Sequence, residues 1–178
     1  MIVAVRHPKP AIAASICYGQ LDVALAQPPA AVAKALIDRL AARRIDRIVA
    51  SPLQRARHLA DAVAEGLGLS LDVEPRLQEL NFGVWEGLAW DSIAREEIDA
   101  WAADPLGYRP RGGETVGELS SRVEQVWREA AASAQHELWI THAGPMRCLY
   151  ALTKKQPLAQ CLDQRFDYGE VLELGSLA

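Results

Sequence analysis

Short apolar runs recur along the chain, and each is flanked by charged residues, glycine or proline. Runs of this kind are typical of strands that are buried on both faces of a parallel sheet. They predict strands at residues 2–5, 46–50, 71–73, 137–141 and 171–174. The first run is followed at once by Arg6-His7 and two prolines, so its carboxyl end is clearly marked.

Between these runs, apolar residues recur every three or four positions, the spacing that gives a helix one buried face. This spacing predicts helices at residues 30–43, 51–68, 91–103, 115–134 and 143–152. Ser51 is expected to cap the second of these helices, with Pro52 as its first helical residue. Thr115 and Glu118 are expected to form a capping box at the start of the fourth.

Strands and helices therefore alternate almost throughout the chain, with loops at 11–28 and 75–90. Alternation predicts one domain, residues 1–178, built as a three-layer α/β/α sandwich around a mainly parallel sheet. The length suits one domain, and the chain has no repeat or linker. Ligands of such sheets bind beyond the carboxyl ends of the strands, so the residues there are the candidates for chemistry.

Composition and charge narrow the possible partners. The net charge of −4 argues against a protein that coats nucleic acid or an anionic membrane. No segment approaches the roughly 20 apolar residues of a membrane span, and the N-terminal run is too short for a signal peptide. Three cysteines, Cys17, Cys148 and Cys161, form no CxxC pair and are expected to be free thiols. We therefore expect a cytoplasmic protein without nucleic-acid or membrane partners.

Cationic and dipolar groups follow three of the predicted strands. Arg6-His7 follows the first, the segment from Ser51 to Arg55 follows the second, and His142 follows the strand at 137–141. A single histidine after a strand is usually a surface or hydrogen-bonded residue. Three such groups at equivalent strand ends predict an anion pocket, and phosphate matches both arginine forks and helix N-termini.

Four sequence blocks extend this interpretation to a family. They are Arg6-His7, the Ser-Pro-Leu-Gln-Arg-Ala segment at 51–56, the Glu-Leu-Asn-Phe-Gly-Val-Trp-Glu-Gly segment at 79–87, and Thr-His-Ala-Gly at 141–144. In this order they resemble the motifs of the histidine phosphatase (phosphoglycerate mutase-like) superfamily. The resemblance implies a phosphoglycerate mutase-like fold and a phosphohydrolase that needs neither a metal nor another cofactor.

The resemblance also implies a role for each matching residue. His7 is the nucleophile that accepts the phosphoryl group, giving a phosphohistidine that water later hydrolyses. Glu79 is the proton donor to the leaving oxygen. The groups around the phosphoryl oxygens are Arg6, Arg55, His142 and the backbone N–H of Ala143.

Neighbouring residues receive structural assignments. Glu86 is expected to shape its loop, and Arg57 to point away from the pocket because it lies two helical positions past Arg55. His58 and His136 match no motif and are expected at the surface. The five tryptophans are expected mainly in the core.

A subgroup is suggested by residues around these blocks. Cys17-Tyr18-Gly19, followed by Asp22-Val23 and Leu25, resembles a stretch of α-ribazole-5′-phosphate phosphatases, which act late in cobalamin biosynthesis. This resemblance implies a small phosphorylated substrate. The implied substrate contacts are Tyr18, Gly19, Gln20 and Trp85.

Three departures from the pattern leave other hypotheses open. Pro8 stands where the superfamily usually has Gly, Gln20 where the subgroup often has Arg, and residues 11–16 are largely apolar. One alternative is another small histidine phosphatase or mutase, acting on a sugar phosphate, phosphoglycerate or protein phosphohistidine. Another is a catalytically weakened phosphate-binding module, although such a module has no need of Glu79. The oligomeric state is left open between monomer and homodimer.

Overall fold

Five strands form one sheet in the order β3-β2-β4-β1-β5. The computed structural model describes residues 1–174, so the last four residues of the expected domain, 175–178, lie outside the described part. The strands are β1 (Ile2–Arg6), β2 (Arg47–Ala50), β3 (Leu71–Val73), β4 (Glu137–Thr141) and β5 (Val171–Leu174). All pairs are parallel except β1 with β5, which confirms the mainly parallel sheet.

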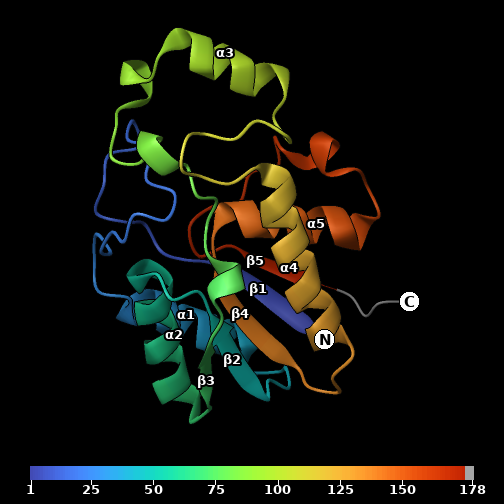
Figure 1. Cartoon of the computed structure of the whole chain (residues 1–178). Helices are drawn as coiled ribbons and strands as arrows, with labels where there is room; N and C mark the ends of the chain where they lie inside the picture. Colours follow the sequence, from blue (N-terminus) through green and yellow to red (C-terminus); the bar gives the residue numbers. More distant parts are fainter. Residues whose placement is uncertain (175–178) are drawn as a thin grey trace.

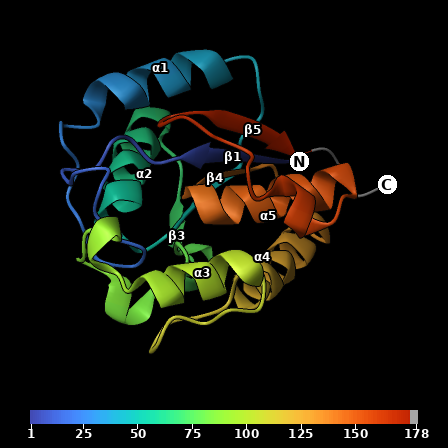
Figure 2. The same cartoon turned by 90° about the horizontal axis from the view of Figure 1, so that it is seen from above.

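Helices cover both faces of this sheet. They are α1 (Ala30–Leu40), α2 (Gln54–Leu67), α3 (Arg95–Ala103), α4 (Val116–Ala131) and α5 (Ala143–Lys154). Figures 1 and 2 show α1 and α2 on one face and α4 and α5 on the other, which confirms the three-layer arrangement. Helix α3 lies apart from the sheet, beyond the ends of the strands (Figure 1). Within residues 1–174, no helix is long and apolar enough to cross a membrane.

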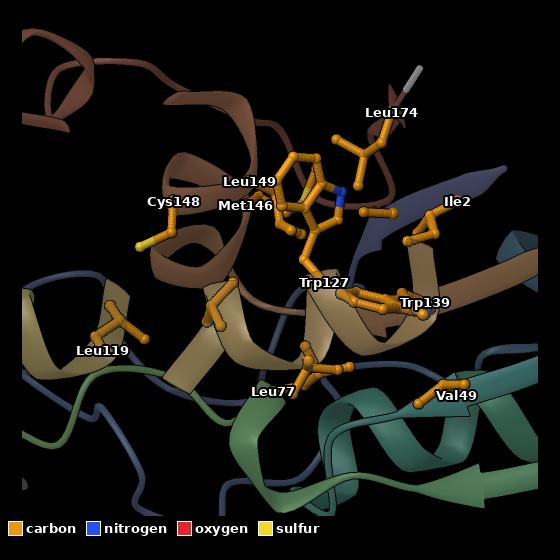
Figure 3. Close-up of a cluster of buried hydrophobic side chains, with 14 of the residues drawn as sticks. Ile2, Val49, Leu77, Leu119, Trp127, Trp139, Met146, Cys148, Leu149 and Leu174 are labelled. Carbon is orange, nitrogen blue, oxygen red and sulfur yellow. The ribbon is translucent and has the colours of Figure 1, made fainter. Parts of the chain in front are cut away.

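Successive strand residues point to opposite faces, so the central strands β1, β2 and β4 contribute to two cores. On one face, Val3 and Ile140 join the cluster formed with α1 and α2. On the other, Ile2, Val49 and Trp139 pack against α4 and α5 (Figure 3). Burial on both faces explains why these central strands read as continuous apolar runs rather than as alternating ones.

The start of α2 differs from the prediction. The helix begins at Gln54 rather than at Pro52, with Leu53 in the N-cap position. Its cap comes from a distant loop, because Oδ1 of Asp22 accepts a hydrogen bond of 2.8 Å from the backbone N–H of Gln54. The Ser51 hydroxyl, expected to cap the helix, accepts a hydrogen bond of 3.3 Å from the N–H of Leu53 and lies 2.7 Å from Nε2 of His142.

Three other helices are shorter than predicted. The helix expected at 91–103 begins only at Arg95, because Trp90–Ser92 forms a separate 3-10 turn. The helices expected to reach 43 and 134 end at Leu40 and Ala131. The capping box is confirmed: Glu118 N–H donates to Thr115 Oγ1 at 3.0 Å, and Thr115 N–H donates to the Glu118 carboxylate at 2.8 Å.

Candidate active site

The register of the sheet brings the motif residues together. Arg6 is paired with Thr141 across β1 and β4, so His7 and His142 leave the sheet side by side. Their ring centroids are 5.0 Å apart. Arg55, in the first turn of α2, completes a group in which His7, His142 and Arg55 are each at most 1% exposed. Three residues from distant parts of the sequence thus form one buried site, in which Arg55 supplies the positive charge and burial lowers the pKa of both histidines.

The environment of His7 fixes which nitrogen can react. Its Nδ1 lies 2.6 Å from the carbonyl oxygen of Pro8. Because a carbonyl only accepts, Nδ1 carries the proton and Nε2 keeps its lone pair. Burial lowers the pKa of His7 to about 3, with further lowering by the charges of Arg55 and Arg6. The imidazole is therefore neutral near pH 7, the state that a nucleophile requires.

Pro8 contributes to this arrangement, although the sequence marked it as a departure. Its missing N–H removes a donor beside His7. Its carbonyl oxygen nevertheless holds the His7 ring in the tautomer that exposes Nε2. Proline at position 8 therefore keeps the hydrogen bond that orients the His7 ring.

Two arginines and His142 present buried nitrogen atoms that have no hydrogen-bond partner. Arg55 donates to the carbonyl oxygens of Leu21, at 2.8 Å, and Gly19, at 2.6 Å. Arg6 donates to another backbone carbonyl, but Nε of Arg6, Nε of Arg55 and Nδ1 of His142 are buried without any partner. Among residues 1–174 these are the only buried side-chain nitrogen or oxygen atoms in that state. Buried polar groups are normally hydrogen-bonded, so three orphans in one place indicate a site for an anion.

Glu79 is held at the edge of this site by the N-terminus of α5. Its Oε1 accepts hydrogen bonds from the backbone N–H groups of Gly144, at 3.0 Å, and Leu80, at 2.9 Å. A Cβ at position 144 would lie 2.1 Å from Oε1, so glycine is needed for this approach. The Glu79 carbonyl oxygen accepts from Gln20, at 2.9 Å, and Arg122, at 3.0 Å. Both ends of the residue are therefore fixed.

A cavity of about 630 Å³ opens beside these groups. Its walls include five residues named from the sequence: Arg6, Tyr18, Gly19, Glu79 and Ala143. Much of the remaining wall is apolar, and one side is formed by Phe82, Trp90 and Trp101. The Trp90 and Trp101 rings are stacked at 6.0 Å with an interplanar angle of 6°. The cavity can therefore hold a bulky apolar group next to a phosphoryl group.

Two expected substrate contacts need correction. Trp85 is fully buried and absent from the cavity wall, because it packs between Tyr108 and Phe82 in the aromatic cluster. Gln20 is also absent from the wall, since its side chain is bonded to the Glu79 backbone. Trp90 and Trp101, rather than Trp85, line the cavity.

The structural assignments of neighbouring residues agree with the sequence. Oε1 of Glu86 accepts from the backbone N–H groups of Gln20, at 2.8 Å, and Phe82, at 3.0 Å, so this carboxylate shapes the loop. Arg57 points outward and pairs with Asp61 at 2.9 Å.

Sequence analysis missed Tyr168, which precedes β5 and belongs to none of the four blocks. Its ring centroid lies 5.7 Å from that of His7 and 3.9 Å from Cζ of Arg6. Arg122 was also missed, although it supports Glu79 from α4. Neither residue lies in a motif, and their positions follow only from the packing of remote elements.

Comparisons with known proteins agree with this geometry. The family model described as the histidine phosphatase superfamily (branch 1) matches residues 2–176. The adenosylcobalamin/alpha-ribazole phosphatase of Salmonella typhimurium is 30% identical over 171 residues, which cover 93% of this chain and 85% of that protein. Phosphoserine phosphatase 1 of Hydrogenobacter thermophilus is 28% identical, over 74% of this chain and 65% of that protein.

Solved structures of phosphatases also superimpose on this chain. The alpha-ribazole phosphatase from Shigella flexneri superimposes with a TM-score of 0.85 at 25% identity, covering 96% of this chain and 87% of that one. A mycobacterial glucosyl-3-phosphoglycerate phosphatase superimposes with a TM-score of 0.82 at 28% identity, covering 94% and 85% of the two chains.

Proposed function

This chain belongs to the histidine phosphatase superfamily, branch 1, and from that membership we propose that it hydrolyses α-ribazole-5′-phosphate through a phosphohistidine at His7. The relatives named above include phosphatases of several phosphomonoesters, so family membership supports the reaction more directly than the substrate. The substrate is argued from the cavity beside the site.

In the first step, Nε2 of His7 attacks phosphorus and the P–O bond to the leaving alcohol breaks. The protonated carboxyl of Glu79 gives its proton to the leaving oxygen. The unpartnered donors of Arg6, Arg55 and His142 bind the phosphoryl oxygens, whose negative charge they offset in a buried site.

In the second step, water attacks the phosphohistidine. The Glu79 carboxylate, now deprotonated, accepts a proton from this water. The P–N bond breaks, inorganic phosphate leaves, and His7 regains its lone pair on Nε2. Each group thereby returns to its starting state.

The aromatic cavity is the observation that carries the choice of substrate. α-Ribazole is a nucleoside with a planar bicyclic base, and the stacked Trp90 and Trp101 offer such a base an apolar face. The volume of about 630 Å³ lies in the range of ligand pockets that enclose molecules of this size. Phosphoserine and phosphoglycerate have no ring to contact this wall.

A substrate panel tests the proposal. We expect kcat/KM for α-ribazole-5′-phosphate to exceed that for phosphoserine, 3-phosphoglycerate and glucosyl-3-phosphoglycerate by roughly tenfold or more. Trp101→Leu should reduce this preference, whereas Val84→Ala, which alters an exposed residue of the neighbouring loop, should not. Preference for a small substrate would assign another phosphatase activity. Phosphate binding without turnover of any substrate would indicate a binding module.

A further inference from the structure

The phosphate site is enclosed, although a phosphoryl group has to reach it. His7, His142 and Arg55 are each at most 1% exposed, and none of the three belongs to the cavity wall. Two tyrosines lie against this group from different parts of the chain. Tyr18 comes from the loop after β1, and Tyr168 from the turn before β5.

Each tyrosine ring faces one of the two phosphate-site arginines. Cζ of Arg6 lies 3.9 Å from the centroid of Tyr168, and Cζ of Arg55 lies 5.1 Å from that of Tyr18. Both distances fall within the range of cation–π attraction. Burial raises the pKa of Tyr18 to about 12, and the Tyr168 phenol adds to this rise.

Tyr168 is fixed relative to Arg6 by its own turn. The Gly169 N–H donates to the Arg6 carbonyl oxygen at 3.0 Å, and the Arg6 N–H donates to the Glu170 carbonyl oxygen at 3.1 Å. The Arg6 guanidinium also donates to the Phe166 carbonyl oxygen at 2.6 Å. Gly169 has φ of +78°, a conformation that glycine adopts readily and that lets the turn close. The backbone on both sides of Tyr168 is thus held against Arg6 by hydrogen bonds.

We propose that Tyr18 and Tyr168 form a tyrosine cover over the phosphate site, in which Tyr168 is a positioning residue for Arg6 and a shield for His7. The inference rests on the proposed role of His7. Tyr168 is 41% exposed, so it is the half of the cover that faces solvent. The cover keeps bulk water from the site and aims the Arg6 guanidinium at the phosphoryl group.

Two readouts test the cover without relying on turnover. The first is the rate at which diethyl pyrocarbonate modifies His7, followed by mass spectrometry. The second is the dissociation constant of inorganic phosphate, measured by calorimetry. Tyr168→Ala should make His7 react several-fold faster and weaken phosphate binding roughly 2- to 30-fold, the range expected for a lost cation–π contact. Tyr168→Phe retains the ring and should rescue both properties.

Tyr150→Ala is the matched control. Tyr150 packs on Phe166, with ring centroids 6.1 Å apart, so its loss disturbs the same segment without removing the cover. Equal effects in Tyr150→Ala and Tyr168→Ala would overturn the proposal, as would unchanged His7 reactivity in Tyr168→Ala. If Tyr168→Ala does not fold, Tyr168→Leu supplies an apolar side chain without an aromatic face and gives the same comparison. Loss of turnover in His7→Ala tests the proposed function separately.

Discussion

The protonation of His7 connects the local structure to the chemistry. Burial lowers the pKa of its imidazole to about 3, below the ordinary value of 6.5. Between these two values the unfolded chain binds a proton that the folded protein excludes. The contribution of His7 to stability is therefore fully present above pH 6.5 and is lost as the pH falls toward 3.

We predict that the His7 imidazole stays neutral down to about pH 4, because its pKa in the folded protein is about 3. NMR of labelled histidine checks this, with the His7 signal assigned from its absence in His7→Gln. A titration midpoint near the ordinary value of 6.5 would contradict the buried environment described here.

A second prediction concerns Gly144, which lets α5 approach the Glu79 carboxylate. A Cβ at this position would lie 2.1 Å from Oε1 of Glu79, so Gly144→Ala should displace the carboxylate. Loss of a positioned acid typically costs about 10²–10⁴ in rate, and we expect kcat to fall toward this range. Gly117→Ala in α4 is the control, because its nearest new contact is 3.5 Å away. Similar activity in the two variants would show that the approach of Glu79 to α5 is not needed.

At the scale of elements, the loop after β1 determines how α2 presents Arg55. Asp22 caps α2 through the Gln54 N–H, and the Gln54 side chain donates to the Asp22 carbonyl oxygen at 2.9 Å. The neighbouring Leu21 carbonyl oxygen accepts from Arg55 at 2.8 Å. One loop therefore caps the helix and also orients its arginine.

Asp22→Ala should lower the free energy of unfolding by about 1 kcal/mol, the usual loss for a missing N-cap. It should also raise KM, because Arg55 would lose part of its support. Asp22→Asn keeps an acceptor and is expected to restore both properties, since Asn is as good a cap as Asp. Urea unfolding and steady-state kinetics measure the two effects. An alanine variant as stable as the wild type would exclude the capping role.

Periodic elements were predictable from the sequence because their cause is local. The five strands are short apolar runs, and the capping box of α4 is recognisable from Thr115 and Glu118. The start of α2 was not predictable, because its cap is supplied by Asp22, 32 positions away. A helix boundary decided by a remote residue leaves no signal in the segment itself.

The candidate site divides in the same way. Four residues of the site lie in sequence motifs: His7, Arg55, Glu79 and His142. The structure brings the two histidines, Arg55 and Glu79 to one edge of the sheet. The residues that complete the site depend on tertiary packing. Tyr168 lies beside His7 because β5 pairs with β1. Trp90 and Trp101, not Trp85, line the cavity, although all three pack in the same aromatic cluster. Aromatic residues in a loop do not reveal from sequence which of them faces a cavity.

At the scale of the whole molecule, the sheet and the long segment between β3 and α4, which contains α3, contribute different parts of the site. The strand ends supply His7 and His142, whereas the segment between β3 and α4 supplies Glu79 and the aromatic wall. Figure 1 shows that α3, in this segment, lies beyond the carboxyl ends of the strands. Under the proposed function, phosphoryl transfer takes place at the strand ends and the longer loops select the substrate.

The phosphohistidine is the central claim, and it can be measured directly. Enzyme mixed with ³²P-labelled phosphomonoester in EDTA and quenched in alkali should carry label on His7, mapped by peptide analysis. A phosphoramidate is expected to survive alkali and to be lost in acid, and His7→Ala should carry no label. Label that withstands acid, or that persists in His7→Ala, would contradict the account.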